Sequence, residues 1–226
     1  MLEITFTDEW QAAHPGAMIG LLEVSGAENT GASPRLEKVK RETEARLKER
    51  FGGYTRADFL ALPVMAAYAR YYRRFSKTYH VLLQVESIAL KGKGLPDVSP
   101  LVDANFTAEV EAHVLTAGHD AARLQGALRI DIAREGEYFT QPNGMPKALQ
   151  AGDMVMRDAG GVGCSIIYGQ DNRSLISAAT THALYVAYAP VGVPAESVNN
   201  QLEKIEEHVR LFSPGAVVQR SFLLAA

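Results

Sequence analysis

The chain has 226 residues, of which 47% are hydrophobic and 22% charged, and its formal net charge at pH 7 is −3. This composition predicts a globular protein with a substantial core, and any affinity for nucleic acid must come from a local basic patch. No apolar run approaches the roughly 20 residues needed to cross a bilayer, and the acidic N-terminus lacks the order of a signal peptide. The single cysteine, Cys164, excludes an internal disulfide, and no Cys/His cluster has metal-ligand spacing. We therefore expect a cytoplasmic protein without a metal.

The first half of the chain is predicted to be mainly helical. Residues 2–6 alternate as an edge strand does, and residues 18–24 indicate a buried strand. Helices are predicted at residues 34–50, 63–75, 81–90 and 100–115. We expect the first of these helices to be exposed, because its lysines and glutamates are spaced for i,i+4 ion pairs. Gly118 is expected to end the last one.

The pattern changes from helical to β at residue 127. Strands are predicted at residues 127–133, 138–140, 154–157, 162–167, 183–188 and 216–224. We expect the run 183–188 to complete the same sheet as 162–167. Residues 196–212 predict an amphipathic helix. A helical first half followed by a β-rich second half indicates one α+β domain.

Polar residues gather between the two apolar runs of the segment 164–188. Gln170, Asp171 and Arg173 supply an amide, a carboxylate and a guanidinium at a strand end, where they can bind a polar group. The alternative is that Asp171 and Arg173 only cap and solvate a loop. In a predicted loop further upstream, His119 beside Asp120 can form an acid–base pair, or Asp120 can simply cap the next turn.

A local basic patch lies between residues 70 and 93. Its members are Arg70, Arg73, Arg74, Lys77, Lys91 and Lys93. Glycines frame Lys91 and Lys93, which places both lysines where they can meet phosphate. Interleaved tyrosines can add a stacking surface, although we expect Tyr68 and Tyr72 in the core. The alternative for the whole patch is an ordinary solvated helix face.

Four segments carry, in order, a resemblance to a known family. They are residues 91–105 (KGKGLPDVSPLVDAN), 117–126 (AGHDAARLQG), 129–137 and 169–186. They resemble the editing (B3/B4) domain of the bacterial phenylalanyl-tRNA synthetase beta subunit and, more closely, freestanding proteins built from that domain. The resemblance covers about the whole chain, with an N-terminal extension (1–60), a core (61–190) and a C-terminal helix and strand (191–226).

The resemblance implies an α+β fold in which a helical first half packs on a β-rich second half, a sheet sandwich of the B3/B4 editing-domain type. It implies a tRNA-binding, trans-editing protein that hydrolyses the ester of a mischarged aminoacyl-tRNA with a positioned water. No cofactor, DNA or membrane is expected, and the chain should not charge tRNA. The alternatives are a non-catalytic RNA-binding module and a binder of a free amino acid or related metabolite.

This hypothesis gives the candidate residues specific roles. The catalytic group is His119, Gln170 and Thr181; the substrate-binding group is Asp103, Asn105, Asp120, Asp171, Arg173 and Thr180; the six basic residues of the patch contact RNA. In it, His119 positions or deprotonates the water, and Asp171 binds the α-ammonium group. Gln170 stands where the synthetase has a glutamate that helps to recognise the tyrosine hydroxyl.

Overall fold

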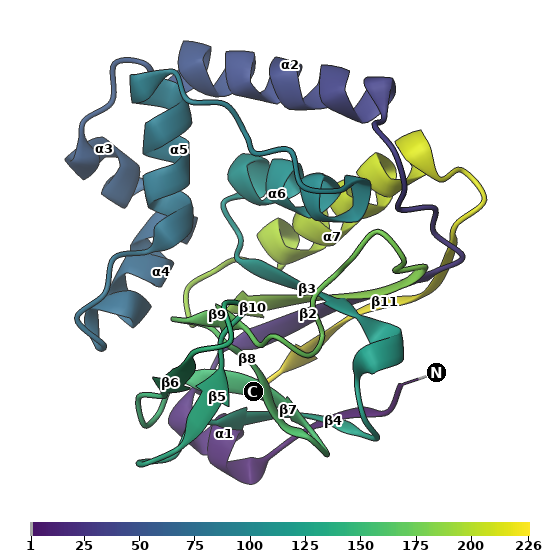
Figure 1. Cartoon of the computed structure of the whole chain (residues 1–226). Helices are drawn as coiled ribbons and strands as arrows, with labels where there is room; N and C mark the ends of the chain where they lie inside the picture. The colour runs from purple at the N-terminus through teal and green to yellow at the C-terminus, as the bar shows by residue number, and fades with distance from the viewer. Residues whose placement is uncertain (1) are drawn as a thin grey trace.

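Two β-sheets and a layer of helices make up the computed structural model, which describes residues 2–226 (Figure 1). The first sheet has the strand order β11-β2-β10-β3, the second has the order β1-β4-β7-β8-β9, and β5 and β6 form a separate hairpin. The strands are β1 (Ile4–Phe6), β2 (Met18–Ser25), β3 (Thr116–Asp120), β4 (Leu128–Ile132), β5 (Tyr138–Thr140), β6 (Pro146–Ala148), β7 (Met154–Asp158), β8 (Gly161–Ser165), β9 (Gly169–Gln170), β10 (His182–Ala189) and β11 (Val217–Ala225). The predicted α+β fold is confirmed.

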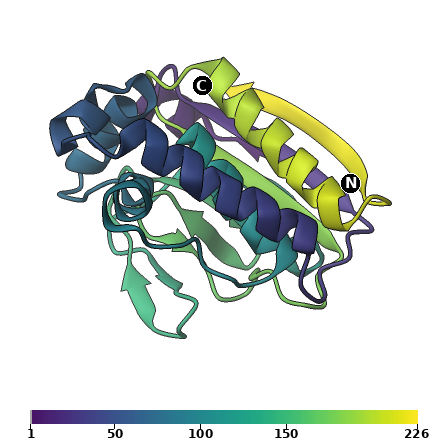
Figure 2. The same cartoon turned by 90° about the horizontal axis from the view of Figure 1, so that it is seen from above.

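The helices lie mainly on the outer face of the four-stranded sheet. They are α1 (Asp8–Ala13), α2 (Pro34–Phe51), α3 (Arg56–Ala61), α4 (Pro63–Arg73), α5 (His80–Lys91), α6 (Pro100–Ala112) and α7 (Ala195–Phe212), with a 3₁₀ turn at Ala121–Arg123. α6 and α7 cover the sheet and α2 lies over α6 and alongside α7, while α3, α4 and α5 stand at one end (Figures 1 and 2). No helix within residues 2–226 is long and apolar enough to span a membrane.

The centre of the four-stranded sheet is buried on both faces. β2 and β10 pair antiparallel over eight residues, from Met18 opposite Ala189 to Ser25 opposite His182. Continuous apolar runs suit such strands, because helices cover one face and the second sheet covers the other. At Gly20 a Cβ atom would lie 2.5 Å from a methyl carbon of Val198 on α7, so the missing side chain lets the helix approach the sheet.

The most charged helix, α2, is less exposed than its sequence predicts. Lys40 is 1% exposed, and its ammonium group pairs with Asp97 and with Asp103, the latter at 3.0 Å. The prediction of an exposed helix was wrong for the face that carries Lys40, because Asp97 in the segment before α6 and Asp103 in the first turn of α6 both reach this lysine.

The helix predicted at 100–115 ends three residues early. His113 takes a left-handed conformation with φ of 62° and caps α6, a place where glycine is more usual. Thr116–Asp120 then forms strand β3, so Gly118 does not end a helix, and His119 and Asp120 lie in a strand and not in a loop.

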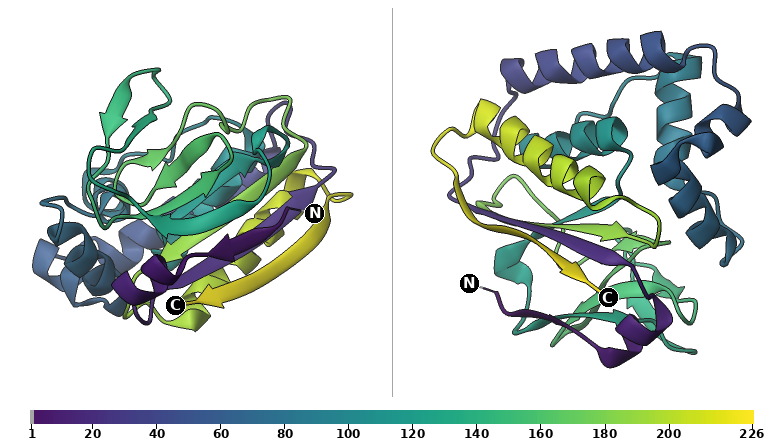
Figure 3. Two further views of the ribbon diagram at one scale, coloured as in Figure 1. Left: turned by 90° about the horizontal axis from the view of Figure 1, so that it is seen from below. Right: turned by 180° about the vertical axis from the view of Figure 1, so that it is seen from behind.

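The apolar run 183–188 does not complete the sheet that contains β8. It belongs to β10, which pairs with β2 and β3, whereas β8 pairs with β7 and β9. The segment 164–188 therefore crosses from one sheet to the other, and its polar middle lies beside β3, where Leu175 bridges His119. The β5–β6 hairpin projects from the body of the sheets (Figure 3).

Candidate functional site

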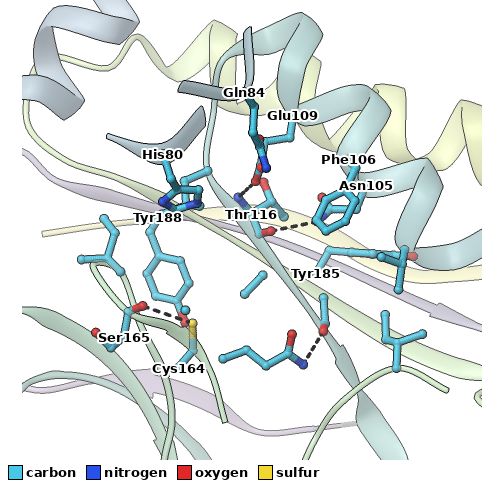
Figure 4. A pocket seen from close by; sticks show the side chains of 18 residues that line it. His80, Gln84, Asn105, Phe106, Glu109, Thr116, Cys164, Ser165, Tyr185 and Tyr188 are labelled. Carbon is cyan, nitrogen blue, oxygen red and sulfur yellow. Dashed lines mark hydrogen bonds between the residues drawn. The ribbon is translucent and has the colours of Figure 1, made fainter. Parts of the chain in front are cut away.

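A cavity of about 280 Å³ lies between α5, α6 and the strands β3, β8, β9 and β10 (Figure 4). α6 contributes Val102, Asn105, Phe106 and Glu109 to its wall. Their spacing of three, four and seven residues places them on one helical face, so a single element presents both polar and apolar side chains to the cavity. The rest of the wall is mainly apolar.

Glu109 is the acidic group of the cavity wall. Its Oε2 accepts a hydrogen bond from the backbone N–H of Thr116 at 2.9 Å, and the residue is 2% exposed. Burial raises the pKa of this carboxyl to about 8, which keeps it mostly protonated at neutral pH. A carboxyl with a strongly raised pKa in a cavity marks a candidate functional group.

Two further polar atoms of the wall lack partners within residues 2–226. Asn105 donates its amide N–H to the carbonyl oxygen of Thr116 at 2.8 Å, but its Oδ1 is buried without a hydrogen bond. The hydroxyl of Tyr188 is also buried and makes no hydrogen bond to an oxygen or nitrogen atom of residues 2–226, and its polar neighbour is the Cys164 thiol. A buried polar atom without a partner costs about 1–3 kcal/mol, so such atoms around one cavity point to a ligand or ordered water.

On the opposite wall, Gln170 connects two strands. Its side-chain N–H₂ group donates to the carbonyl oxygens of Gly118 at 2.7 Å and Ser174 at 3.1 Å. Both amide hydrogens are therefore committed to the backbone, and only Oε1 can accept a hydrogen bond from a ligand. Of the residues predicted to bind substrate or to act in catalysis, Gln170 and Asn105 line the cavity; their roles stay predictions.

His119 lies on β3 next to the cavity-lining Gly118 but does not line the cavity. It is 0% exposed, and burial lowers its pKa to about 4, so the ring is neutral at pH 7. Its Nδ1 lies 2.7 Å from the hydroxyl oxygen of Ser174, which donates to Asp171 at 2.7 Å. The serine therefore lies between the histidine and the aspartate, unlike a catalytic triad, in which the histidine is central.

The same polar network engages Asp171 and Arg173. Arg173 Nε lies 2.6 Å from Asp171 Oδ2, and its Nη1 lies 3.0 Å from Asp158 Oδ1. Asp171 also accepts the backbone N–H of Ser174 at 3.1 Å. These contacts hold the segment after β9 in place, while Arg173 Nη2 is buried without a hydrogen-bond partner within residues 2–226.

The other predicted substrate-binding residues, and Thr181 of the predicted catalytic group, also lie outside the cavity wall. Thr180 donates to Asp120 at 2.8 Å, and Asp120 caps the 3₁₀ turn by accepting the N–H of Ala122, as predicted for a cap. Thr181 is exposed. Asp103 is two residues from Asn105, about 200° around the helix, and it lines a separate cavity with Lys40.

The members of the predicted basic patch have different neighbours in the structure. A groove of about 330 Å³ contains Lys93 and shares His80, Gln84 and Phe106 with the cavity. Arg70 lies against Gly192, and Arg74 lies over the rings of Tyr71 and Phe75; like Arg73 and Lys91, they line neither the cavity nor the groove.

Lys77 has a basic neighbour that the sequence did not reveal. Its ammonium lies 5.5 Å from the ring centre of Tyr168, and that of Lys147, from β6, lies 4.5 Å from the same ring. Tyr168 immediately precedes Gly169 of the cavity wall. Two cations from distant segments thus meet beside the site.

Sequence analysis also missed Glu109. The available signal was weak, because Glu109 lies between the apolar residues Ala108 and Val110 but a second glutamate, Glu111, follows at once. Residues 2–226 contain no group of three or more His, Cys, Asp or Glu side chains placed to hold a metal ion.

Comparison with known proteins agrees with this fold. The sequence model of the B3/4 domain matches residues 64–206, a span that includes the whole cavity wall. The crystal structure of an N-terminal fragment of the phenylalanyl-tRNA synthetase beta subunit from Pyrococcus horikoshii is similar, with a TM-score of 0.50 and 8% identity. The match covers 100% of this chain and 55% of that one, and it concerns the fold alone. No curated protein matches the sequence at a significant level. Because the family match spans well over half of its length, the chain belongs to the B3/4 domain family.

Proposed function

We propose that this B3/4 protein binds the aminoacylated end of a tRNA and hydrolyses its ester bond. The observation that carries the proposal is the cavity of about 280 Å³ with an apolar body and polar groups at two ends. Drug-sized ligands occupy pockets of roughly 300–1,000 Å³, so this cavity suits a smaller group such as one aminoacyl moiety. The family match and the fold likeness to the synthetase fragment support the same substrate class.

The proposed reaction needs no protein nucleophile. A water oxygen attacks the ester carbonyl carbon, the bond from that carbon to the ribose oxygen breaks, and the water proton passes through the neighbouring ribose hydroxyl to the leaving oxygen. Gln170 Oε1 can accept a hydrogen bond from this water, and the Tyr188 hydroxyl can donate to the carbonyl oxygen. Holding the water and the ester together supplies most of the rate gain.

The hypothesis drawn from the sequence changes in one respect. Because His119 has no exposed surface and Asp171 is held by Arg173 and Ser174, we give neither residue direct contact with the substrate. Their proposed role is to fix the segment that carries Gln170 against β3.

The RNA would approach over the two basic features nearest the cavity. The first feature is the pair Lys77 and Lys147, whose ammonium groups lie near the ring of Tyr168. The second is Lys93, which lies in the groove next to the cavity. Lysines contact phosphate groups and an aromatic ring can stack on a base, so these side chains suit the single-stranded end of a tRNA.

Deacylation of a panel of mischarged tRNAs tests the proposal. We expect release of the amino acid from at least one tRNA above the spontaneous rate, and a roughly tenfold or greater loss of rate in Gln170→Ala. Gln125→Ala makes the same change at an exposed amide and should behave as wild type. Absence of hydrolysis across the panel, or equal rates in both variants, would reject the proposal; binding without hydrolysis would favour a non-catalytic RNA-binding module.

A further inference from the structure

The polar end of the cavity next to α6 holds two oxygen atoms that can accept hydrogen bonds from a ligand. Asn105 Oδ1 is unpaired, while the amide nitrogen of the same side chain is held by Thr116. Glu109 Oε2 accepts the N–H of Thr116, which leaves Oε1 without a hydrogen bond from residues 2–226. Both side chains are more than nine-tenths buried and line the cavity from one face of α6.

Among residues 2–226, Glu109 is the only group of the cavity wall that can carry a charge near neutral pH. No lysine or arginine of this described part of the chain lines the cavity. Burial lowers the pKa of His80 to about 4 and raises that of Cys164 to about 12, so both are neutral. The tyrosines that face Glu109 from α4 and its following loop are neutral too, because burial raises their pKa values: they are Tyr68, Tyr72 and Tyr79.

We propose that Glu109 and Asn105 bind the primary ammonium group of the ligand, and that the cavity therefore prefers an amino acid whose carboxyl group is esterified over the free amino acid. An ammonium group has three hydrogens, which can satisfy both unpaired oxygens at once. A free carboxylate would find no cation in this wall and would meet the Glu109 carboxylate. This inference rests on the proposed function. In that function, Glu109 and Asn105 would orient the aminoacyl group by its ammonium, and repulsion between the product carboxylate and Glu109 would favour release of the free amino acid.

Binding of an ammonium group has a signature that binding of a hydroxyl group lacks. At pH 6 the free protein keeps Glu109 protonated, because its pKa is about 8. An ammonium group that pairs with it stabilises the carboxylate, so the protein releases about one proton per ligand. A hydroxyl group can instead donate to Asn105 and accept from the protonated carboxyl, and no proton is released.

Isothermal titration calorimetry at pH 6, in two buffers of different ionisation enthalpy, measures this proton. The probes are the amides of L-leucine, L-methionine, L-phenylalanine and L-tyrosine, which carry the ammonium group but neither a carboxylate nor a labile ester. Matched controls are the N-acetyl amides, which lack the charge, and the free amino acids. We expect at least one amide to bind with release of about one proton, and its N-acetyl form to bind roughly 30-fold more weakly or worse.

The variant Glu109→Gln should bind the amide at least roughly 30-fold more weakly and release no proton. The comparison of amide with N-acetyl amide uses wild-type protein, so it decides the matter even if the variant fails to fold. Failure of every amide to bind, binding without proton release, or equal binding of the acetylated or free forms would overturn the inference. The outcome is separate from deacylation: amide binding with proton release and no tRNA hydrolysis would reject the proposed function and leave ammonium recognition standing.

Discussion

The backbone N–H of Thr116 donates to Glu109 Oε2 at 2.9 Å and so connects the last turns of α6 with the first residue of β3. The same carboxyl group faces the cavity. One buried residue thereby joins the helical layer to the four-stranded sheet and supplies the acidic group of the candidate site.

Glu109 should make the fold less stable as the pH rises. Its pKa is raised from 4.5 to about 8 in the folded state, so between these values the unfolded chain ionises while the folded chain stays protonated. Stability is therefore lost from about pH 4.5 to pH 8. We expect Glu109→Gln to gain stability relative to wild type over this range, by on the order of a few kcal/mol at pH 8. Urea denaturation of both proteins at pH 5 and pH 8 checks this. A difference in unfolding free energy between variant and wild type that is the same at both pH values would contradict the prediction.

Buried histidines predict a second loss of stability, in mild acid. Burial lowers the pKa values of His14, His80, His113 and His119 from 6.5 to about 4. Between these values the unfolded chain binds protons that the folded chain does not, so stability falls as the pH drops from about 6.5 towards 4. Thermal melts of wild type and His113→Gln at pH 7 and pH 5 measure the effect; the variant should lose less than wild type on acidification, and equal losses would argue against these assignments.

Gln170 should tolerate loss of its side chain better than gain of a charge. In Gln170→Glu a carboxylate would face the carbonyl oxygens of Gly118 and Ser174, which now accept the amide hydrogens. We expect Gln170→Ala to lose roughly 1–3 kcal/mol of stability and Gln170→Glu to lose more at pH 7. Chemical denaturation of both variants tests the order, and a glutamate variant as stable as wild type would show that this side chain does not hold β9 to β3.

The lysines beside Tyr168 should contribute to RNA binding through phosphate contacts. The double variant Lys77→Ala/Lys147→Ala should lower the slope of log K against log salt by roughly 1.4–1.8 if each lysine contacts one phosphate. The control Lys48→Ala/Arg129→Ala removes two exposed charges on α2 and β4. Fluorescence anisotropy with a labelled tRNA between low and moderate salt gives the slopes, and equal slopes in the two double variants would refute the contact.

The long elements could be predicted because their local patterns agree with the packing. α7 presents one apolar stripe, and β2 and β10 are mainly apolar strands that are buried along most of their length. The short helices α1 and α3 were missed because each has six residues and buries one side chain, Trp10 and Phe59. The sheet that residues 183–188 join is decided by pairing with β2, far away in sequence, and no local pattern reveals it.

The candidate site was located in part, and the reason is geometric. Gln170 and Asn105 could be chosen from their residue types and positions, and both line the cavity. Asp171 and His119 have suitable chemistry, but other side chains contact them. The Asp171–Arg173 pair is the loop contact that the sequence left open as an alternative. The contact of His119 with Ser174 spans 55 residues and depends on tertiary structure. Glu109 was missed because a glutamate in a helix usually faces water, whereas α6 is buried on nearly all sides.

The most direct test of the account is to fill the cavity and measure aminoacyl-tRNA hydrolysis. Ala117 lines the cavity from β3, so Ala117→Leu would occupy space that we assign to the aminoacyl group; Ala122→Leu makes the same change at an exposed position. On the tRNA that wild type deacylates best, we predict at least a roughly tenfold loss of kcat/KM in Ala117→Leu and none in Ala122→Leu. Equal hydrolysis by wild type and the filled variant, with both folded, would contradict the claim that the ester is held in this cavity.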